Sequence, residues 1–459
     1  MRVEGGPERE ELRRRLAALG AAVPGLLLPR EGIDLSRWAV IACDQFTQDR
    51  AYWDRLEAQG AFPSSLRLIY PEVYLEDRDR GERIAAIHRT MEDYLSGGIF
   101  GEPLKGFVYI ERDTPFQKGR RGLLICLDLE QYDWRPESSL LTRATEGTVT
   151  ERIPPRMEVR RGAALELPHI LLLINDGENK LLPALGERAK AGRALYDTEL
   201  RPDSGRVRGW LLEGEADWEF LAAGLEALAR RAGHGQGGIS PDAEGGAFLY
   251  AVGDGNHSLA AAKAVWEEYK QAHRGEKDLE RHPARWALAE LENLYDPALT
   301  FEPIHRVIFG AEPEEILAAL GELPGFTCGA LRDRAELERL LENPVPGKNR
   351  YGLAAGSRYI LVEAAVPGIA TGPLQPVLDR FTAAGKDRTI DYIHGADSCF
   401  RLARSEKTTA ILLPPVKKED LFLTVAQSGP LPRKSFSMGE AEEKRFYLEC
   451  RRLFVPRGA

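Results

Sequence analysis

The sequence predicts a mixed α+β fold in which two α/β parts follow one another along the chain. With 459 residues, of which 43% are hydrophobic, the chain is long enough for two to three domains with sizeable cores. Within residues 248–270, an apolar run, a polar glycine loop and an alanine-rich stretch predict a strand, a loop and a helix. Beyond residue 300, strand and helix patterns alternate regularly, as in α+β or α/β domains.

Three parts are expected along the chain. Residues 1–36 form an N-terminal helical extension, residues 37–280 an α/β domain that carries the glycine loop, and residues 296–459 a C-terminal α+β domain. The best border lies between residues 275 and 300, although no long linker marks it. The sequence shows no repeat of roughly twenty to fifty residues and no low-complexity tract.

Amphipathic and alternating patterns place the elements of the first half. Residues 7–20 predict a helix with its leucines facing inward, and residues 38–42 predict a short strand. Thr47 or Asp49 is expected to cap the helix that follows this strand. Further helices are expected at 79–97, 178–193 and 215–231, and strands at 106–111, 121–128, 170–174, 195–201 and 206–212.

The second half predicts a regular succession of short elements. A glycine-rich loop at 233–246 precedes the 248–270 stretch. Strands are expected at 286–295, 303–309, 325–331, 350–355, 358–365, 389–394 and 408–413. Helices are expected at 312–321, 333–342, 374–384, 397–404 and 417–428, and a final helix at 439–454.

The composition argues against several classes of function. A formal net charge of −9 gives no overall field toward nucleic acid or anionic lipid, so nucleic acid is not an expected partner. Five cysteines without a C-x-x-C pair argue against a disulfide framework and a thiolate zinc site. No apolar run approaches the roughly 18 residues of a membrane span. We therefore expect a cytoplasmic protein without a membrane segment.

The loop Gly253–Ser258 is the strongest candidate site in the sequence. Gly253 and Gly255 allow a close approach of the backbone, and the helix start offers N–H groups and a partial positive charge to an anion. Asp254 and His257 supply an acid and a base. This interpretation makes the loop a phosphate-binding site.

A plain structural interpretation of the same loop stays open. Asn256 or Ser258 caps the helix in a tight strand–helix turn, and no ligand is involved. The motif is neither a Walker A motif nor G-x-G-x-x-G, so its pattern alone does not decide between the two interpretations. No G-x-S-x-G, H-E-x-x-H or Cys–His signature supports a hydrolase.

Other candidates stand beside predicted strands or helices. Asp44 and Glu146 lie in loops, where carboxylates hold Mg²⁺ or accept a proton, or merely cap helices. His305 and Arg306 form a cationic pair inside an apolar strand, which needs an anionic ligand or an internal carboxylate. Arg433, Lys434 and Ser435 lie just before the final predicted helix and have two interpretations. They bind a phosphate or carboxylate group, or they form a cationic loop without a ligand.

These motifs, in this order, resemble a family of bacterial and archaeal proteins described only as a domain of unknown function. The resemblance covers nearly the whole chain, from about residue 37 to residue 450, and as a set the motifs are specific. The matching pieces are Ala42–Phe46, Thr145–Thr148, Gly253–Ser258, Pro303–Ile308, Asp391–His394 and Pro432–Ser435.

The loop is also similar to that of the ParB/sulfiredoxin-like superfamily, which includes ParB-type nucleotide-binding domains, sulfiredoxin and a free-serine kinase. Those relatives carry D-G-x-H-R at the start of a helix that binds nucleotide phosphates. Asp254, Gly255 and His257 match this pattern, whereas Ser258 replaces the arginine and removes a bidentate phosphate contact. The resemblance implies a ParB/sulfiredoxin-like strand–loop–helix core in the first part of the chain.

The resemblance and the charged motifs together imply an enzyme that binds a nucleotide, ATP or ADP with Mg²⁺, and transfers a phosphoryl group to a small hydroxylated metabolite. Asp254, His257, Glu146 and Asp44 are the expected catalytic residues, and the metal ligands stay open. The expected ligand-binding residues are Gly253, Gly255, Asn256, Ser258, His305, Arg306, Arg433, Lys434 and Ser435.

Two further functions remain open. One is a non-catalytic, ParB-like nucleotide switch that binds without turnover. The other is a redox protein of sulfiredoxin type, for which Cys43 is the cysteine beside a matching motif.

Overall fold

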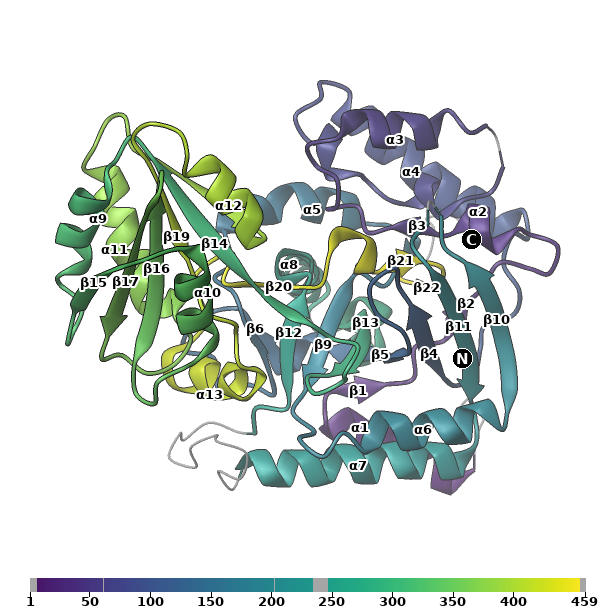
Figure 1. The fold of residues 1–459 in the computed structure, drawn as a ribbon. Coiled ribbons are helices and arrows are strands. Elements are labelled where there is room, and N and C mark those ends of the chain that lie inside the picture. Colours follow the sequence, from purple (N-terminus) through teal and green to yellow (C-terminus); the bar gives the residue numbers. More distant parts are fainter. Residues whose placement is uncertain (1–5, 61, 202, 234–246, 455–459) are drawn as a thin grey trace. The chain divides into compact units, whose positions relative to one another are not determined.

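The computed structural model describes residues 6–60, 62–201, 203–233 and 247–454 (Figure 1). It divides the chain into two compact units, and both mix helices with strands, as predicted. Unit 1 comprises Met1–Ala144, Thr148–Leu299 and Glu440–Ala459, and unit 2 comprises Thr145–Gly147 and Thr300–Gly439. The predicted glycine-rich loop lies outside the described residues from 234 to 246. None of the helices described is long and apolar enough to cross a bilayer.

A large mixed sheet forms the centre of unit 1. It pairs β4 with β5, and β13 with β5 and β9, and β12 runs antiparallel to β9. In sheet order the strands are β10 (Arg193–Glu199), β11 (Arg206–Leu212), β4 (Phe107–Asp113), β5 (Arg120–Asp128), β13 (Trp286–Asn293), β9 (Ile170–Ile174), β12 (Tyr250–Asp254), β7 (Thr142–Ala144) and β6 (Tyr132–Asp133), with β1 (Ala21–Ala22) on β5.

Two small sheets complete unit 1 and hold the C-terminal segment. β22 (Cys450–Arg452) pairs with β2 (Leu26–Leu27) and β8 (Leu165–Glu166), and β21 (Phe446–Tyr447) pairs with β3 (Val40–Ile41). The helices are α1 (Pro7–Ala18), α2 (Leu35–Trp38), α3 (Arg50–Glu57), α4 (Arg80–Ser96), α5 (Ile153–Arg160), α6 (Leu181–Lys190), α7 (Glu215–Gly233) and α8 (Asn256–Ala272). Short 3-10 helices are η1 (Ser65–Leu68), η2 (Glu72–Tyr74), η3 (Leu129–Gln131), η4 (Thr150–Arg152), η5 (Leu279–Arg281), η6 (Pro283–Arg285) and η7 (Ala441–Glu443).

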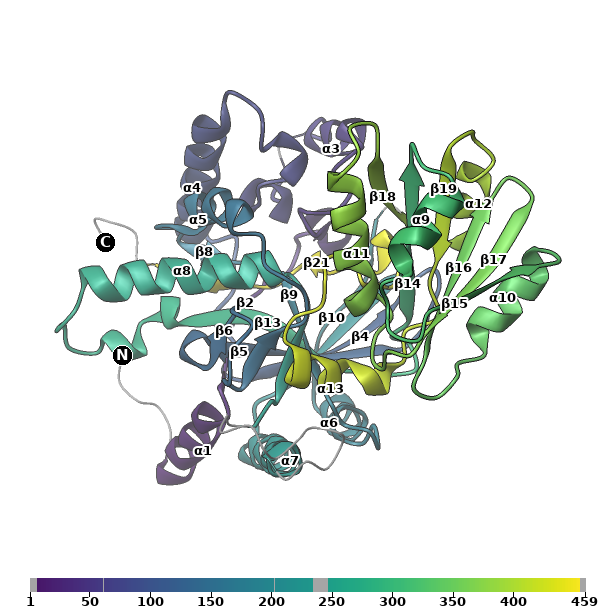
Figure 2. The same cartoon turned by 90° about the vertical axis from the view of Figure 1, so that its left-hand side faces the viewer.

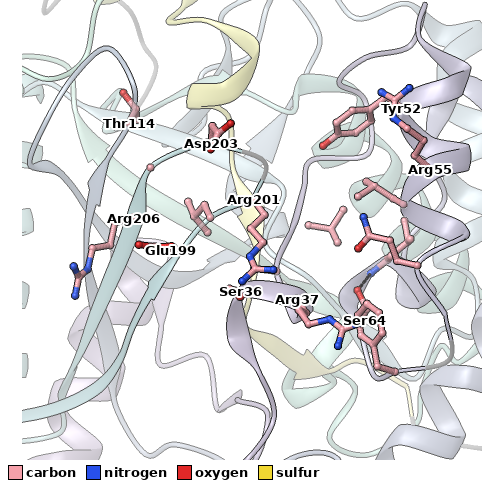
Figure 3. Close-up of a pocket in the computed structure, with 18 of the residues that line it drawn as sticks. Ser36, Arg37, Tyr52, Arg55, Ser64, Thr114, Glu199, Arg201, Asp203 and Arg206 are labelled. Atoms are coloured by element: carbon pink, nitrogen blue, oxygen red, sulfur yellow. Dashed lines mark hydrogen bonds between the residues drawn. The ribbon is translucent and has the colours of Figure 1, made fainter.

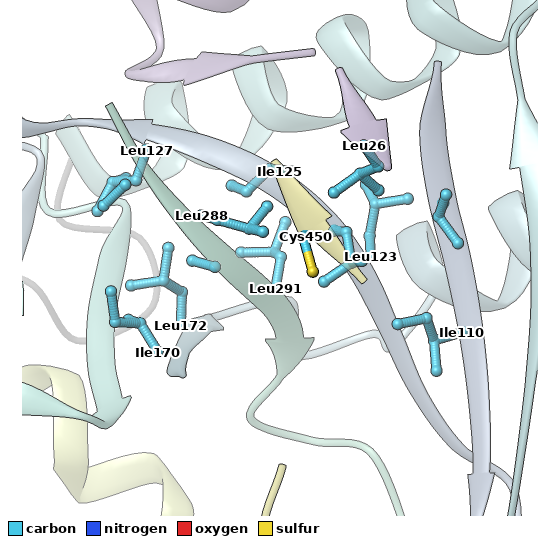
Figure 4. Packing of buried hydrophobic residues seen from close by; sticks show 14 of the residues in the cluster. Leu26, Ile110, Leu123, Ile125, Leu127, Ile170, Leu172, Leu288, Leu291 and Cys450 are labelled. Carbon is cyan, nitrogen blue, oxygen red and sulfur yellow. The ribbon is translucent and has the colours of Figure 1, made fainter. Parts of the chain in front are cut away.

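The core of unit 1 lies on the apolar faces of its central strands (Figure 4). Leu123, Ile125 and Leu127 recur at every second position of β5, and so point to the same face of the sheet. They are fully buried. Figure 2 shows α8 lengthwise with α5 beside it, and the two helices pack through small and aliphatic side chains such as Met157 and Ala261.

Unit 2 is an antiparallel sheet with helices on both faces. An apolar cluster lies on each face of this sheet. Successive side chains of β14 point to opposite faces, so Val307 belongs to one cluster and Ile308 to the other. α9 and α11 cover one face, and α10 and α12 cover the other. The strands in order are β15 (Thr327–Leu331), β17 (Arg358–Ala364), β16 (Asn349–Ala355), β19 (Thr408–Leu412), β14 (Phe301–Phe309) and β18 (Thr389–His394), with β20 (Phe436–Met438) on β14. The helices are α9 (Pro313–Leu320), α10 (Arg334–Glu342), α11 (Thr371–Ala383), α12 (Ala396–Leu402) and α13 (Lys418–Ser428).

The final helix predicted at 439–454 is wrong. This segment forms η7 and the short strands β21 and β22, and it belongs to unit 1 rather than to the predicted C-terminal domain of 296–459. Its charged residues suit a helix by propensity, but tertiary interactions override propensity. Here the segment adds a strand to each small sheet, so its backbone groups pair across chain segments instead of along a helix.

A buried network of ion pairs holds this C-terminal segment against the large sheet. Arg120 on β5 makes a two-pronged contact with Glu292 on β13, at 2.8 and 2.6 Å. Arg112 contacts the same carboxylate at 3.2 Å and donates to the carbonyl of Lys444 at 2.9 Å. Arg445 reaches Glu290 at 3.4 Å and also pairs with Glu449. Each of these side chains is at most 2% exposed, so the network lies in the interior.

One pH effect follows from the interior of unit 2. Burial, and then the positive charges of Arg306 and His394, lower the pKa of His305 to about 4, and its Nδ1 accepts the N–H of Leu413 at 3.1 Å. The folded state therefore disfavours the protonated imidazole, whereas the unfolded chain protonates it near pH 6.5. The contribution of His305 to the free energy of unfolding is therefore complete above pH 6.5 and decreases as the pH falls toward 4.

We expect this loss to reach about 3 kcal/mol of unfolding free energy at pH 4. Asparagine keeps a side-chain acceptor but does not titrate. The difference in Tm between the parent protein and His305→Asn should therefore shrink as the pH falls from 7 to 4.5. Parallel Tm curves for the two proteins over this range would contradict the assignment of a neutral, buried His305.

Candidate functional site

The predicted loop is a sharp strand-to-helix turn at the end of β12. Gly253 and Asp254 end the strand, Gly255 follows at φ +79°, and α8 begins at Asn256. A side chain at Gly255 would meet the backbone of Ile170 at 3.2 Å and the ring of His169 at 3.1 Å, so glycine is needed both for the backbone angle and for the space. Because β9 runs antiparallel to β12, the residue before β9 lies beside this turn.

Polar side chains of the loop have defined contacts. Asp254 accepts the N–H of Gly255 at 2.9 Å and pairs with Lys444 at 3.2 Å. His257 accepts the N–H of Val149 at its Nε2, at 3.1 Å. The side-chain oxygen of Asn256 is buried and has no hydrogen-bond partner in the part of the chain that the structure describes. A buried polar atom of this kind needs a hydrogen-bond partner, which an ordered water molecule or a ligand can supply.

Asp44 comes to the same place from the other end of the chain. It follows β3, and the N–H of Ala42 donates to the carbonyl of Arg445 at 2.8 Å, which places Asp44 next to the segment that carries Lys444. Its carboxylate accepts from Gln45 at 2.8 Å and lies 3.5 Å from Nε2 of His169. Burial alone would raise the pKa of Asp44, but His169 and Gln45 outweigh it and hold this pKa below its usual range.

A chain of side chains leads from Asp44 to a cysteine. Nδ1 of His169 lies 2.5 Å from the hydroxyl of Tyr447, which donates to Sγ of Cys43 at 3.4 Å. The N–H of Cys43 donates back to the same hydroxyl at 3.2 Å. Burial disfavours the charged imidazole, but Tyr447 and Asp44 outweigh it and raise the pKa of His169 well above its usual value. His169 is therefore a buried cation held between two oxygen groups.

A pocket of about 160 Å³ opens on this cluster. Its polar lining includes Glu72 and Arg156, which pair with one another, and Ser258 at the start of α8. Burial is the main cause that raises the pKa of Glu72, with the nearby charge of Asp44 acting in the same direction. Most of the remaining lining is hydrophobic, as in most small-molecule sites, and Tyr70, Arg160 and Glu166 also contribute to it.

The chemistry available is acid–base and electrostatic. His169 and Lys444 present two cations beside a helix start, and Asp254 presents a partly exposed carboxylate. Asp44 is a weak base, since its pKa is held low, and it is better suited to orient His169. The described residues contain no group of three or more His, Cys, Asp or Glu that could hold a metal ion.

The predicted residues of unit 2 form a separate cluster within that unit. Arg306 is fully buried, and its guanidinium donates to Gln375 at 3.0 Å and to the carbonyl of Lys434 at 2.9 Å. The carbonyls of Ile304 and Arg433 accept from it as well. Burial, partly offset by Tyr392 and Asp379, lowers its pKa to about 10.

Two further contacts complete this cluster. Glu146 accepts the N–H of Lys434 at 2.5 Å, and Ser435 accepts from Thr371 at 2.7 Å. These bonds are internal to unit 2, and the phosphate-binding role of its residues stays a prediction.

Within unit 1, the structure brings Asp44 together with the Gly253–Ser258 loop, both of which the sequence singled out. Three residues that complete the site were missed: His169, Lys444 and Tyr447. His169 stands before an apolar strand, and the other two lie in the segment predicted as a helix. The fold thus defines unit 1 as a mixed α/β module with a polar site at a strand–glycine–helix turn.

The chain belongs to a family described as "Protein of unknown function (DUF1015)", whose model matches residues 27–381. This confirms the resemblance to a family of unknown function. A search of curated proteins finds no match.

Solved structures with a similar arrangement include a conserved hypothetical protein from Pyrococcus furiosus, 12% identical with a TM-score of 0.33, over 73% of this chain and 92% of that chain. They also include a free serine kinase in complex with AMP, 12% identical with a TM-score of 0.35, over 73% of this chain and 90% of the kinase. A mutant free serine kinase in complex with ADP is 12% identical with a TM-score of 0.36, over 73% of this chain and 91% of that chain.

Proposed function

We propose that unit 1 binds a nucleotide or another phosphorylated small molecule at the start of α8 and transfers a phosphoryl group to a small hydroxylated acceptor. The observation that supports this most strongly is the gathering of cations from distant parts of the chain around one helix start. Lys444 pairs with the loop through Asp254, and His169 lies directly beside Gly255. A phosphoryl group in transfer carries negative charge on its oxygens, which cations and helix N–H groups stabilise.

Each residue of the site has a distinct role in this proposal. The first N–H groups of α8 and the hydroxyl of Ser258 cradle the phosphate, and Lys444 and His169 neutralise its charge. Asp254 accepts the proton of the acceptor hydroxyl, and Asp44 orients His169. The buried side-chain oxygen of Asn256, at the same helix start, accepts a hydrogen bond from the ligand in this proposal.

A nucleotide that donates a phosphoryl group normally binds together with Mg²⁺. In such sites the ion is held by one or two protein carboxylates together with the phosphates, so a cluster of three acidic side chains is not required. Asp254 is the carboxylate at the loop, and it fits this limited donor set. When bound, the ion would neutralise charge on the phosphates.

Titration calorimetry with ATP, ADP and CTP tests the binding step. We expect at least one of these nucleotides to bind, and Lys444→Met to weaken its binding at least tenfold, which corresponds to about 1.4 kcal/mol. Lys277→Met, at an exposed lysine of unit 1 away from the site, is the matched control and should bind as the parent does. Absence of binding for all three nucleotides would contradict the proposal.

A second variant tests the geometry of the turn. Gly255→Ala places a methyl group against His169 and the backbone of Ile170 at a left-handed backbone angle, so we expect a loss of stability of about 1 to 2 kcal/mol. The displaced ring should also weaken nucleotide binding, measured at a temperature where the variant is folded. If Gly255→Ala is measurably destabilised but binds the nucleotide with unchanged affinity, His169 does not contact the nucleotide.

A binding site without turnover is the second candidate, and one observation favours it. Asp44 and Asp254 are both already paired with cations, which makes each less available as a base. The two candidates differ in product formation: nucleotide hydrolysis or transfer to a panel of small alcohols supports the enzyme, whereas binding with no product in any mixture supports the switch.

A further inference from the structure

A second and much larger groove lies elsewhere in unit 1. It has a volume of about 1240 Å³, above the roughly 300–1,000 Å³ that is usual for small-molecule pockets. The segments around α2, α3 and η1 form one wall, and the β10–β11 and β4–β5 turns form the other (Figure 3). Val40 lines this groove, whereas its strand partner Tyr447 lines the site pocket, so β3 and β21 separate the two.

The rim of the groove is cationic although the chain as a whole carries a formal charge of −9. Its cationic residues are Arg37, Arg55, Arg67, Lys118, Arg201 and Arg206, against the acidic residues Asp113, Glu199 and Asp203. All six cationic side chains are exposed. Arg55, Lys118 and Arg201 form no ion pair with any described residue. Unpaired cations gathered on one groove indicate an anionic occupant.

The floor of the groove is apolar, and an exposed aromatic side chain stands in one of the turns that border it. Ala39, Val40, Leu56, Leu66 and Leu200 line the floor. Phe116, in the same turn as Lys118, is 56% exposed, which is unusual for a large hydrophobic residue. An apolar floor beneath a cationic rim matches a polypeptide that carries both aliphatic and acidic side chains.

Single-stranded nucleic acid fits this groove less well. Such ligands need open aromatic faces on which bases stack. Of the aromatic residues that line the groove, Tyr52 is only 9% exposed, and Arg37 covers the ring of Phe62 at 3.7 Å. The aliphatic floor offers no comparable contact to a sugar–phosphate backbone.

We propose that this groove is a docking surface for an acidic segment of a partner protein, in which carboxylates flank apolar residues. The carboxylates pair with Arg55, Lys118 and Arg201, and the apolar side chains rest on the floor and against Phe116. This surface is distinct from the phosphate site at α8, and neither depends on the other.

A displayed library of random twelve-residue peptides, selected on the full chain, tests this proposal. We expect enrichment of peptides with several Asp or Glu beside Leu, Ile or Phe. These peptides should bind the triple variant Arg55→Glu, Lys118→Glu, Arg201→Glu at least tenfold more weakly. The matched control Arg14→Glu, Arg89→Glu, Arg281→Glu changes the same charge at exposed sites outside the groove and should bind as the parent does.

An additional variant and a nucleic-acid ligand test the apolar contact and the class of the partner. Phe116→Ser should weaken the selected peptides several-fold, because it removes apolar contact without changing charge. No enrichment, or equal binding of the enriched peptides to the triple variant, would overturn the proposal. It would also be overturned if a twelve-nucleotide oligo-dT bound more tightly than the peptides and lost its binding in the triple variant.

Discussion

Replacing Arg120 by methionine is expected to lower the free energy of unfolding of this protein by about 3 to 5 kcal/mol. The guanidinium of Arg120 makes two short bonds to Glu292 and a third to the carbonyl of Glu443, all in the interior of unit 1. Methionine fills a similar volume but leaves the carboxylate of Glu292 with Arg112 as its remaining cationic partner among the described residues. An incompletely paired buried charge is costly because water cannot solvate it.

Urea denaturation followed by circular dichroism measures this effect. Arg135→Met removes an exposed arginine that pairs with Asp133, and it should change stability by less than about 1 kcal/mol. In the double variant Arg120→Met, Glu292→Gln no charge is left behind at this pair, so it should recover part of the loss. Equal midpoints for Arg120→Met and Arg135→Met would show that the network does not hold the C-terminal segment.

In the proposed phosphoryl transfer, replacing His169 by glutamine is expected to lower the rate by about 10² to 10³-fold, the usual effect of losing one stabilising donor. Glutamine retains hydrogen bonding toward Asp44 and Tyr447 but carries no charge. Because Tyr447 and Asp44 raise the pKa of His169, the parent protein keeps this cation up to pH values well above 6.5. Above pH 7, where the terminal phosphate of the nucleotide is already ionised, the affinity of the parent should therefore stay constant up to pH 8.

His282→Gln is the matched control for this variant. His282 lies in unit 1, and burial followed by the charge of His273 lowers its pKa, so it carries little positive charge at neutral pH. It does not line the site pocket. If both glutamine variants keep the parent's rate and affinity, His169 has no electrostatic role.

Local patterns were sufficient for most of the elements, because their signals lie within a few neighbouring residues. The strands predicted at 195–201 and 206–212 correspond to the paired strands β10 and β11, and the alternating elements of unit 2 are confirmed. α5 was not predicted, since Pro154 and Pro155 stand in a polar stretch that shows no helical pattern. Proline is accepted in the first turn of a helix, where its missing N–H is not needed.

Only some residues of the site could be predicted from the sequence, because the others reach the site through long-range strand pairing. Asp44 stands in a loop and Asp254 at the end of a strand beside a glycine turn, and this pattern is visible in the sequence. His169 follows a proline and precedes an apolar strand, and only the antiparallel pairing of β9 with β12 brings it to Gly255. Lys444 and Tyr447 depend on the pairing of β21 with β3 and on buried charges far away in sequence. Such long-range contacts leave no mark on local periodicity.

A crystal structure of the full chain with a non-hydrolysable ATP analogue and Mg²⁺ tests the central claim most directly. We predict that phosphate oxygens lie within hydrogen-bond distance, about 3 Å, of Ser258 and Lys444, with the first N–H groups of α8 pointing at them. A nucleotide bound in the cationic groove, in unit 2, or nowhere at millimolar concentration would contradict the assignment of the site to the start of α8.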